Sequence, residues 1–354
     1  MRSAATWLAH LRAGGTTPWA AYDGGDPPLP LETEIGAQQL EVLRRLNELG
    51  RVSPALADRV IRADLSGRGH GLLRLAGDEA GGQRRFGTPP VDPSRLPYDE
   101  LIRPVLTLLA EDVAGRGAPE RPVAPRRRRG HPAHRLAGDP LLVDAVRSEL
   151  DRLGRPEGGE GAVTYVLARA LPTMLAATWT WRALADRAPA WEDWLAMLER
   201  TGRLPAEIDL AQQARSAGGG MRIVLDPALL PGALGVDGLT APHDLALGAD
   251  AAELARLVTS VVGLHAGDAS PDLMIRGFAP RLAGGQAAPL AVPEQARAWV
   301  DAQARLLRDT LLRGSCDVLG EPDLLLAPPT PLSGRSPQEP AVLDLALRTL
   351  LEGA

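Results

Sequence analysis

The segment from His134 to Trp181 constrains the fold of this chain more than any other part. It reads as a strand, the turn Gly138-Asp139-Pro140, an amphipathic helix, a glycine-rich loop, a second strand and a second helix. That order is typical of the opening half of a parallel α/β sheet flanked by helices. We therefore expect an α/β domain over residues 134–354, preceded by a mainly helical region.

The remaining apolar residues recur mostly at helical spacing. The main helices expected outside the opening segment are Ala4–Leu11, Ile35–Gly50, Pro54–Arg62, Tyr98–Gly115, Glu294–Arg313 and Glu339–Leu351. Between the mainly helical residues 1–115 and the α/β residues 134–354 lies the segment 116–133. It holds four prolines and the run Arg126–Arg129. This composition predicts a linker, and the arginine run, without interleaved aromatic side chains, fits a solvated patch better than a nucleic-acid site.

Composition excludes several kinds of chemistry. The chain contains no lysine, and its 39 basic residues are all arginine, so Schiff-base chemistry, pyridoxal phosphate attachment and a Walker-type lysine are excluded. Cys316 is the single cysteine, which excludes an internal disulfide and a cysteine-based structural zinc site. The net charge is -5, and no apolar run approaches the length of a membrane span. We expect a cytoplasmic protein with no nucleic-acid partner and no membrane span; its oligomeric state stays open.

The turn Gly138-Asp139-Pro140 follows the first expected strand. A glycine-rich turn that leads into a helix aims free backbone N–H groups at an anion, so this is where such folds hold phosphate. The groups that usually assist are missing here. No lysine follows the turn, no Ser or Thr occupies the first helical turn, and Asp139 places a negative charge at the mouth. The turn therefore indicates a fold more firmly than it indicates a reaction.

Four pieces of sequence follow one another between His134 and Leu326. They are HRLAGDP with its following helix, VTYVLARALPTMLAATWTW, the pair WEDWLAML and LAQQARSAGGGMRIVLDP, and AWVDAQARLLRDTLLRGSCDVLGEPDLLL. In order and spacing this set resembles the actinobacterial sulfotransferase-like proteins, which share the P-loop-type α/β fold of enzymes that use phosphoadenosine phosphosulfate. The helix Ile35–Gly50 also resembles one that this family carries after its VLDP-like strand.

The resemblance implies a place for each end of that cofactor. Gly138 would lie in the phosphosulfate-binding loop, and Arg169 would hold the 3'-phosphate. Family members carry a lysine and small hydroxyl or glycine residues after the loop proline, whereas this chain has Leu141-Leu142-Val143-Asp144. The serine that accompanies the arginine in the family falls on Ala177. The phosphate-binding loop is therefore degenerate.

The missing groups matter in energy. A charge-assisted hydrogen bond to phosphate contributes about 1.5–3 kcal/mol, so losing a lysine and several hydroxyls removes on the order of 5 kcal/mol. We expect a catalytically degenerate sulfotransferase-like protein with no cofactor, acting as a binding or accessory subunit. By analogy with the family, it would serve enzymes that modify cell-surface glycans, with a protein partner or a glycan-related ligand.

Two alternatives stay open. The first is an active sulfotransferase-like enzyme that holds phosphoadenosine phosphosulfate with arginines, because guanidinium grips phosphate bidentately. The candidate arginines are Arg135, Arg147, Arg169 and Arg182, and at least two of them must converge on the Gly138 turn. The second is a structural or oligomerising module, which predicts an exposed apolar patch of more than a few hundred Å².

Other residues carry weaker signals. His243 is a candidate general base, but no companion residue is visible in the sequence. Asp317, Glu321 and Asp323 could bind a divalent cation, although a solvated turn explains them better, and we expect no metal site. The four tryptophans between residues 179 and 194 could line a sugar cleft, but their helical spacing fits a core better.

Two segments of the sequence are similar to each other. Gly36-Ala37, Glu41, Val42, Arg44 and Leu46 match Gly248-Ala249, Glu253, Leu254, Arg256 and Val258 at a constant offset of 212 residues. Two amphipathic helices can share this much by chance. Internal duplication therefore remains an open interpretation.

Overall fold

The computed structural model describes residues 3–25, 35–65, 70–78, 88–117, 119, 133–216, 220–236, 239, 247–265, 270–283, 288–326 and 334–353. The chain divides into two compact units. The first unit comprises Met1–Gly117, Leu257–Leu273 and Gln338–Ala354, and the second comprises Ala118–Arg256 and Met274–Pro337. Most of the expected linker, with its arginine run, lies outside the described residues.

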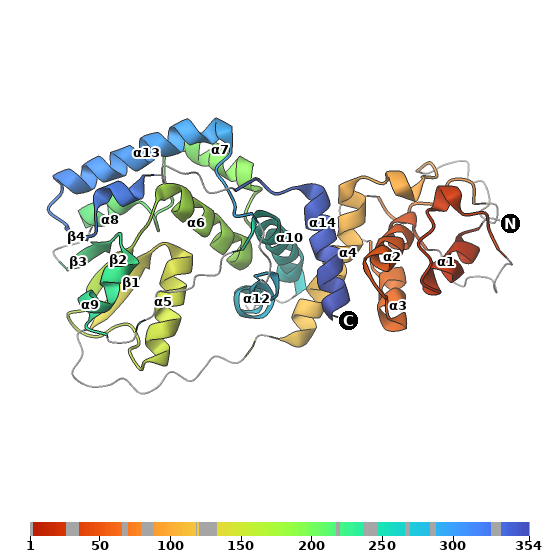
Figure 1. The fold of residues 1–354 in the computed structure, drawn as a ribbon, viewed down its shortest axis with the longest axis horizontal. Coiled ribbons are helices and arrows are strands. Elements are labelled where there is room, and N and C mark those ends of the chain that lie inside the picture. The colour runs from red at the N-terminus through yellow and green to blue at the C-terminus, as the bar shows by residue number, and fades with distance from the viewer. Residues whose placement is uncertain are drawn as a thin grey trace. The chain divides into compact units, whose positions relative to one another are not determined.

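The first unit is helical (Figure 1). Its elements are α1 (Ala4–Arg12), η1 (Trp19–Ala21), α2 (Ala37–Leu49), α3 (Pro54–Arg62), η2 (Pro93–Arg95), α4 (Tyr98–Arg116) and α14 (Glu339–Gly353). The part of α10 (Ala249–His265) from Leu257 onward and α11 (Ser270–Asp272) also belong to it. The expected helical N-terminal region is thus confirmed. Helix α2 is its centre, because every residue from Ala37 to Arg44 is buried and α1, α3, α4 and α14 all contact it.

The buried polar side chains of α2 all have partners. Arg44 donates from Nε and Nη2 to the two carboxylate oxygens of Glu41, both at 2.8 Å, and Gln39 Nε2 donates to Ala63 O at 2.9 Å. The Glu41 side chain is 0% exposed. The hydrogen bonds that Arg44 donates to Glu41 raise the pKa of Arg44 more than burial lowers it, so its guanidinium stays charged. A buried charged pair of this kind is tolerated because each charge is satisfied.

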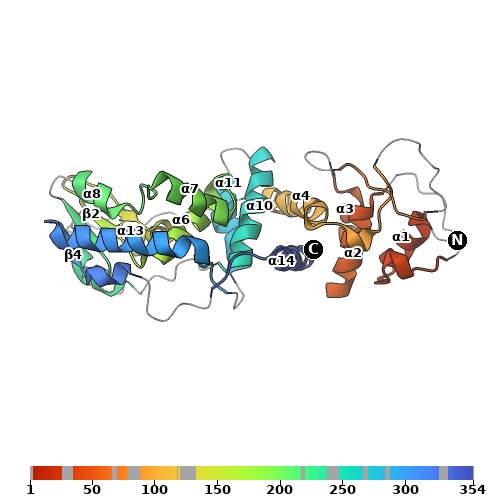
Figure 2. The same cartoon turned by 90° about the horizontal axis from the view of Figure 1, so that it is seen from above.

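Helix α14 packs against helices far from it in the sequence. It lies beside α4 and also contacts α2, and Arg116 Nη2 donates to Gly353 O at 3.0 Å (Figures 1 and 2). The sequence grouped residues 134–354 together, whereas these contacts place the last helix with the N-terminal helices. The reason is the apolar face of α14, whose Val342, Leu343 and Leu350 are buried.

The second unit contains a four-stranded sheet. Its strands are β1 (His134–Gly138), β2 (Val163–Leu167), β3 (Met221–Val224) and β4 (Asp317–Leu319). They pair in the order β1-β2-β3-β4, and every pair is parallel, with Gly138 opposite Leu167 and Leu167 opposite Val224. The expected α/β fold with a parallel sheet is confirmed. Among the described strands the order does not reverse, so the sheet lacks the switch point at which doubly wound sheets hold ligands.

Helices flank the sheet. The remaining elements are α5 (Pro140–Arg152), α6 (Leu171–Ala185), α7 (Trp191–Thr201), α8 (Leu210–Ser216), η3 (Pro227–Leu229), α9 (Leu230–Leu234), α10 up to Arg256, η5 (Leu273–Phe278), α12 (Ala279–Leu282), α13 (Glu294–Arg313) and η6 (Pro322–Leu325). One core joins α5 and α9 to the first three strands through Val146, Tyr165 and Leu234. Helix α13 runs along α6, α7 and α8 (Figures 1 and 2). Within the ranges described, no helix combines the length and apolar character that a membrane span requires.

Candidate functional site

The turn after β1 is held in a conformation that requires glycine. Gly138 has a φ of +106°, and a Cβ atom added to it would lie 2.1 Å from Leu167 O. The next amide, Asp139 N–H, donates to Leu167 O at 2.9 Å, so the turn is fastened to the end of β2. This close approach of two backbones fixes where α5 begins.

Asp139 is the N-cap of α5. Its Oδ1 atom accepts hydrogen bonds from the backbone N–H groups of Leu141 and Leu142, both at 3.1 Å, and Pro140 occupies the first helical position. Aspartate before proline is a favoured helix start, because the carboxylate satisfies free N–H groups and proline has none to satisfy. The sequence suggested a carboxylate at the mouth of the turn, but Asp139 is 0% exposed and points into it. The N–H groups that a helix start offers to an anion are thus satisfied here by a side chain of the protein.

Arg169 completes this arrangement. It follows β2 and precedes α6, and its Nε atom donates to Asp139 Oδ2 at 2.7 Å. The Arg169 side chain is 25% exposed, so the ion pair is largely shielded from water. The residue that the resemblance assigns to the 3'-phosphate therefore faces the carboxylate that caps α5.

The other three candidate arginines are engaged or exposed elsewhere. Arg147 Nε lies 2.9 Å from Glu157 Oε1, and Arg182 Nη2 lies 3.1 Å from Glu207 Oε1 on the surface. Arg135 is exposed on β1. Of the four candidate arginines, Arg169 contacts the turn, through Asp139.

The remaining sequence candidates give no further site. His243 lies outside the described residues. Asp317 pairs with Arg222 at 2.8 Å and Asp323 faces Arg308 at 3.6 Å. Within the parts of the chain that the structure describes, no three His, Cys, Asp or Glu side chains are grouped so as to hold a metal ion.

Three of the four tryptophans of α6 and α7 belong to the core, and the fourth, Trp181, is half-buried. Trp179, Trp191 and Trp194 are each at most 1% exposed, and their rings pack in series at centroid distances of 5.5 and 5.7 Å. They line no open cleft that could stack a sugar.

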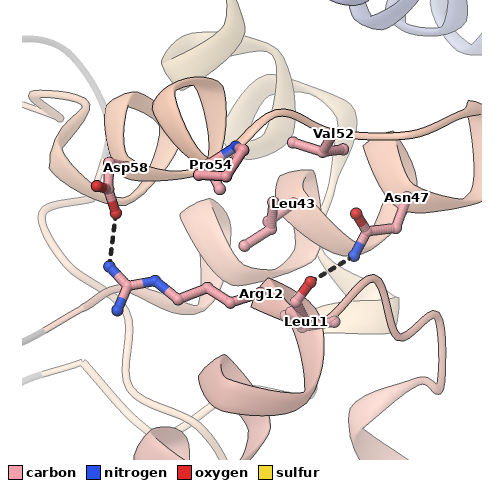
Figure 3. A pocket seen from close by; sticks show the side chains of 8 residues that line it. Leu11, Arg12, Leu43, Asn47, Val52, Pro54 and Asp58 are labelled. Atoms are coloured by element: carbon pink, nitrogen blue, oxygen red, sulfur yellow. Dashed lines mark hydrogen bonds and ion pairs between the residues drawn. The ribbon is translucent and has the colours of Figure 1, made fainter.

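Two surface hollows lie in the first unit. The first has a volume of about 90 Å³ and is bounded by α1, α2 and α3 (Figure 3). Within it, Arg12 pairs with Asp58 at 2.7 Å, and Asn47 Nδ2 donates to Leu11 O at 2.8 Å (Figure 3). The second has a volume of about 340 Å³, and Arg59 on its wall is paired with Asp112 at 2.6 Å. The first is too small for most organic ligands, and the polar groups named in both already have partners.

Comparison with known proteins adds no assignment: no family model, no curated protein and no solved structure matches the chain.

Sequence reasoning identified the turn but not the role of its carboxylate. The signal was present, since Asp-Pro before an amphipathic run is an N-cap pattern. The pairing of Asp139 with a residue thirty positions later had no local signal.

Proposed function

We propose that this chain is a catalytically degenerate sulfotransferase-like protein that serves as a binding or accessory subunit. The observation that carries the proposal is the position of the Asp139 carboxylate at the start of α5. It uses the N–H groups that a bound phosphate would use. Its second oxygen engages Arg169.

Electrostatics argue against adding a phosphate to this turn. Two like charges about 4 Å apart repel by roughly 4 kcal/mol at an effective dielectric constant of about 20. A donor phosphate would therefore have to displace Asp139, which would cost the helix cap and the ion pair with Arg169. The absence of lysine from the chain leaves no second kind of cation to offset that cost.

The alternative of an active enzyme requires several arginines at one place. Arg147 and Arg182 instead pair with Glu157 and Glu207. The accessory role and the link to cell-surface glycans rest on the family resemblance, which would make a protein or a glycan-related molecule the partner.

A thermal-shift titration with phosphoadenosine phosphate tests the proposal. A ligand that binds the folded protein raises its melting temperature with a saturable dependence on concentration. We expect no such shift for the unmodified chain and no transfer of sulfate from phosphoadenosine phosphosulfate to any acceptor. A saturable rise in melting temperature, or sulfate transfer, would overturn the proposal.

A matched pair of variants localises the effect. Asp139→Ser keeps a helix-capping hydroxyl but removes the carboxylate, so inorganic sulfate should stabilise this variant more than the unmodified chain. Asp209→Ser alters the cap of α8, whose Gln212 N–H donates to Asp209 at 2.9 Å, and it should leave the response to sulfate unchanged.

A further inference from the structure

We propose that residues 6–117 and the helical frame of residues 178–353 are two copies of one helical module, paired through their last helices. The matching residues of α2 and α10, 212 positions apart, left internal duplication as an open interpretation. Hydrogen bonds, ring contacts and burial repeat in the same order in both places, and the proposal does not depend on the function proposed above.

The first repeated feature is a pair of tryptophans twelve positions apart. Trp7 Nε1 donates to Thr17 O and Trp179 Nε1 to Pro189 O, both at 3.0 Å and both across ten positions. The two rings of each pair meet at centroid distances of 5.3 and 5.5 Å, at interplanar angles of 52° and 63°. The second tryptophan, Trp19 or Trp191, starts a helical segment in both copies.

The second feature is a helix with a glutamate and an arginine three positions apart. Arg44 grips Glu41 through Nε and Nη2, and Arg256 grips Glu253 through the same two atoms at 2.8 and 2.6 Å. The remaining nitrogen also repeats. Arg44 Nη1 donates to Thr16 O at 3.4 Å and Arg256 Nη1 to Ala188 O at 3.3 Å, the residue before the acceptor of the tryptophan bond in each copy.

The third feature is a pair of extended segments, near residues 73–76 and 91 in the first copy and near residues 288–291 and 335 in the second. Trp19 Nε1 donates to Ala76 O at 2.8 Å, and Trp191 Nε1 donates to Ala291 O at 2.9 Å. Four further backbone contacts of the first copy are the hydrogen bonds Ala37 N to Leu73 O, Ala76 N to Val91 O and Val91 N to Arg74 O, and the parallel bridge Leu75–Val91. Their counterparts in the second copy, in the same order, are Ala249 N to Ala288 O, Ala291 N to Arg335 O and Arg335 N to Pro289 O, and the parallel bridge Leu290–Arg335. One backbone network therefore occurs twice, in one register.

Burial follows the same register. Residues 7, 8, 11 and 19 are buried in the first copy, as are 179, 180, 183 and 191 in the second. Residues 36–40 and 248–252 are buried throughout. The last helices also match, since the buried positions 101, 102, 105, 106 and 109 of α4 have the spacing of 342, 343, 346, 347 and 350 of α14.

The matched helices α4 and α14 pack against each other. Each therefore offers its apolar face to its own counterpart, as two subunits of a symmetric dimer would. The partner that this surface fits is the other copy of the module within the same chain.

The second copy is longer than the first at two places, and each of these longer segments contains one strand of the sheet. Residues 192–247, which include β3, stand in the second copy where residues 20–35 stand in the first. Residues 292–334, which include α13 and β4, correspond to residues 77–90. Strands β1 and β2 and the Gly138 turn lie between the two copies and belong to neither.

Matched substitutions in the full chain test the equivalence. Trp7→Phe and Trp179→Phe each remove one indole hydrogen bond, and so do Trp19→Phe and Trp191→Phe. The control is Trp194→Phe, because the buried Trp194 indole N–H has no hydrogen-bond partner among the described residues. Each of the four variants should melt about 2–4 °C lower than the control, with similar losses within each pair.

A loss at one member of a pair with none at its counterpart would overturn the proposal. If a tryptophan variant does not fold, the same comparison uses Arg44→Lys and Arg256→Lys. A lysine cannot reproduce the two-pronged contact together with the carbonyl contact, so both variants should lower the melting temperature. Arg44→Lys should have the larger effect, because Arg44 also pairs with Glu48 and its partner Glu41 is fully buried. A loss at only one of the two positions would contradict duplication.

Discussion

Asp139 and Arg169 form an ion pair, 2.7 Å long, at the turn between β1 and α5. The carboxylate also caps α5, so one side chain satisfies both the helix terminus and the arginine. A buried charge that satisfies two groups is costly to remove, because both are left without their partner. This relationship ties the start of α5 to the end of β2 through one carboxylate.

Removing the carboxylate should destabilise the second unit. Loss of an N-cap costs about 0.5–2 kcal/mol, and the shielded Arg169 adds to this, so Asp139→Ala should lower the free energy of unfolding by about 2–3 kcal/mol. Asp209→Ala, which removes the more exposed cap of α8, is the control and should cost about 1 kcal/mol or less. Urea unfolding followed by circular dichroism measures both, and equal losses would contradict the role given to Arg169.

Gly138 should tolerate no side chain. Gly138 and Gly158 have nearly the same φ, +106° and +103°. An added Cβ at Gly158 meets nothing within 4 Å, whereas at Gly138 it would overlap Leu167 O. Gly158→Ala should cost about 1–2 kcal/mol from its backbone conformation, and Gly138→Ala should cost about 4 kcal/mol or prevent folding. Equal melting temperatures for the two variants would show that β1 and β2 are not this close.

The parts of the fold set by local pattern were predictable. Helices Pro54–Arg62 and Glu294–Arg313 occur with the bounds expected from apolar spacing and their flanking residues. The parallel sheet followed from short apolar strands alternating with helices. The packing of α14 on α4 was not predictable, because an apolar helix face does not state its partner. The sequence suggests a carboxylate at the mouth of the turn, whereas in the structure Asp139 turns inward and caps α5.

The buried pair of α2 should matter far more than an exposed pair of the same spacing. Arg44→Gln leaves the fully buried Glu41 without its two-pronged partner, and breaking such a pair costs about 3–5 kcal/mol. Arg152→Gln breaks the exposed pair with Glu149, also three positions away, and should give no measurable change. Chemical unfolding of both variants tests this contrast, and a small effect at Arg44 would contradict it.

Glu100 should make the first unit sensitive to acid. Burial by itself would raise the pKa of Glu100, but hydrogen bonds from His70 and Gln38 and the charge of Arg103 outweigh it and hold the pKa below its ordinary value. A carboxyl with a lowered pKa stabilises the fold above its unfolded pKa, and this contribution is lost as the pH falls through the folded pKa.

The unmodified chain should therefore lose more stability than Glu100→Gln as the pH falls below about 4. The measurement is the free energy of unfolding of both proteins from pH 7 to pH 3. Glu199→Gln, at an exposed position of α7, is the control for the loss of a carboxyl group. A difference between Glu100→Gln and the unmodified chain that does not change with pH would contradict the ion-pair network.

Isothermal titration calorimetry of phosphoadenosine phosphate into the unmodified protein tests the central claim most directly. With Asp139 seated on the N–H groups of α5 and paired with Arg169, we predict no saturable heat at concentrations up to about 1 mM, which corresponds to a binding free energy weaker than about -4 kcal/mol. A saturable isotherm in the micromolar range, abolished by Arg169→Ala, would contradict the account.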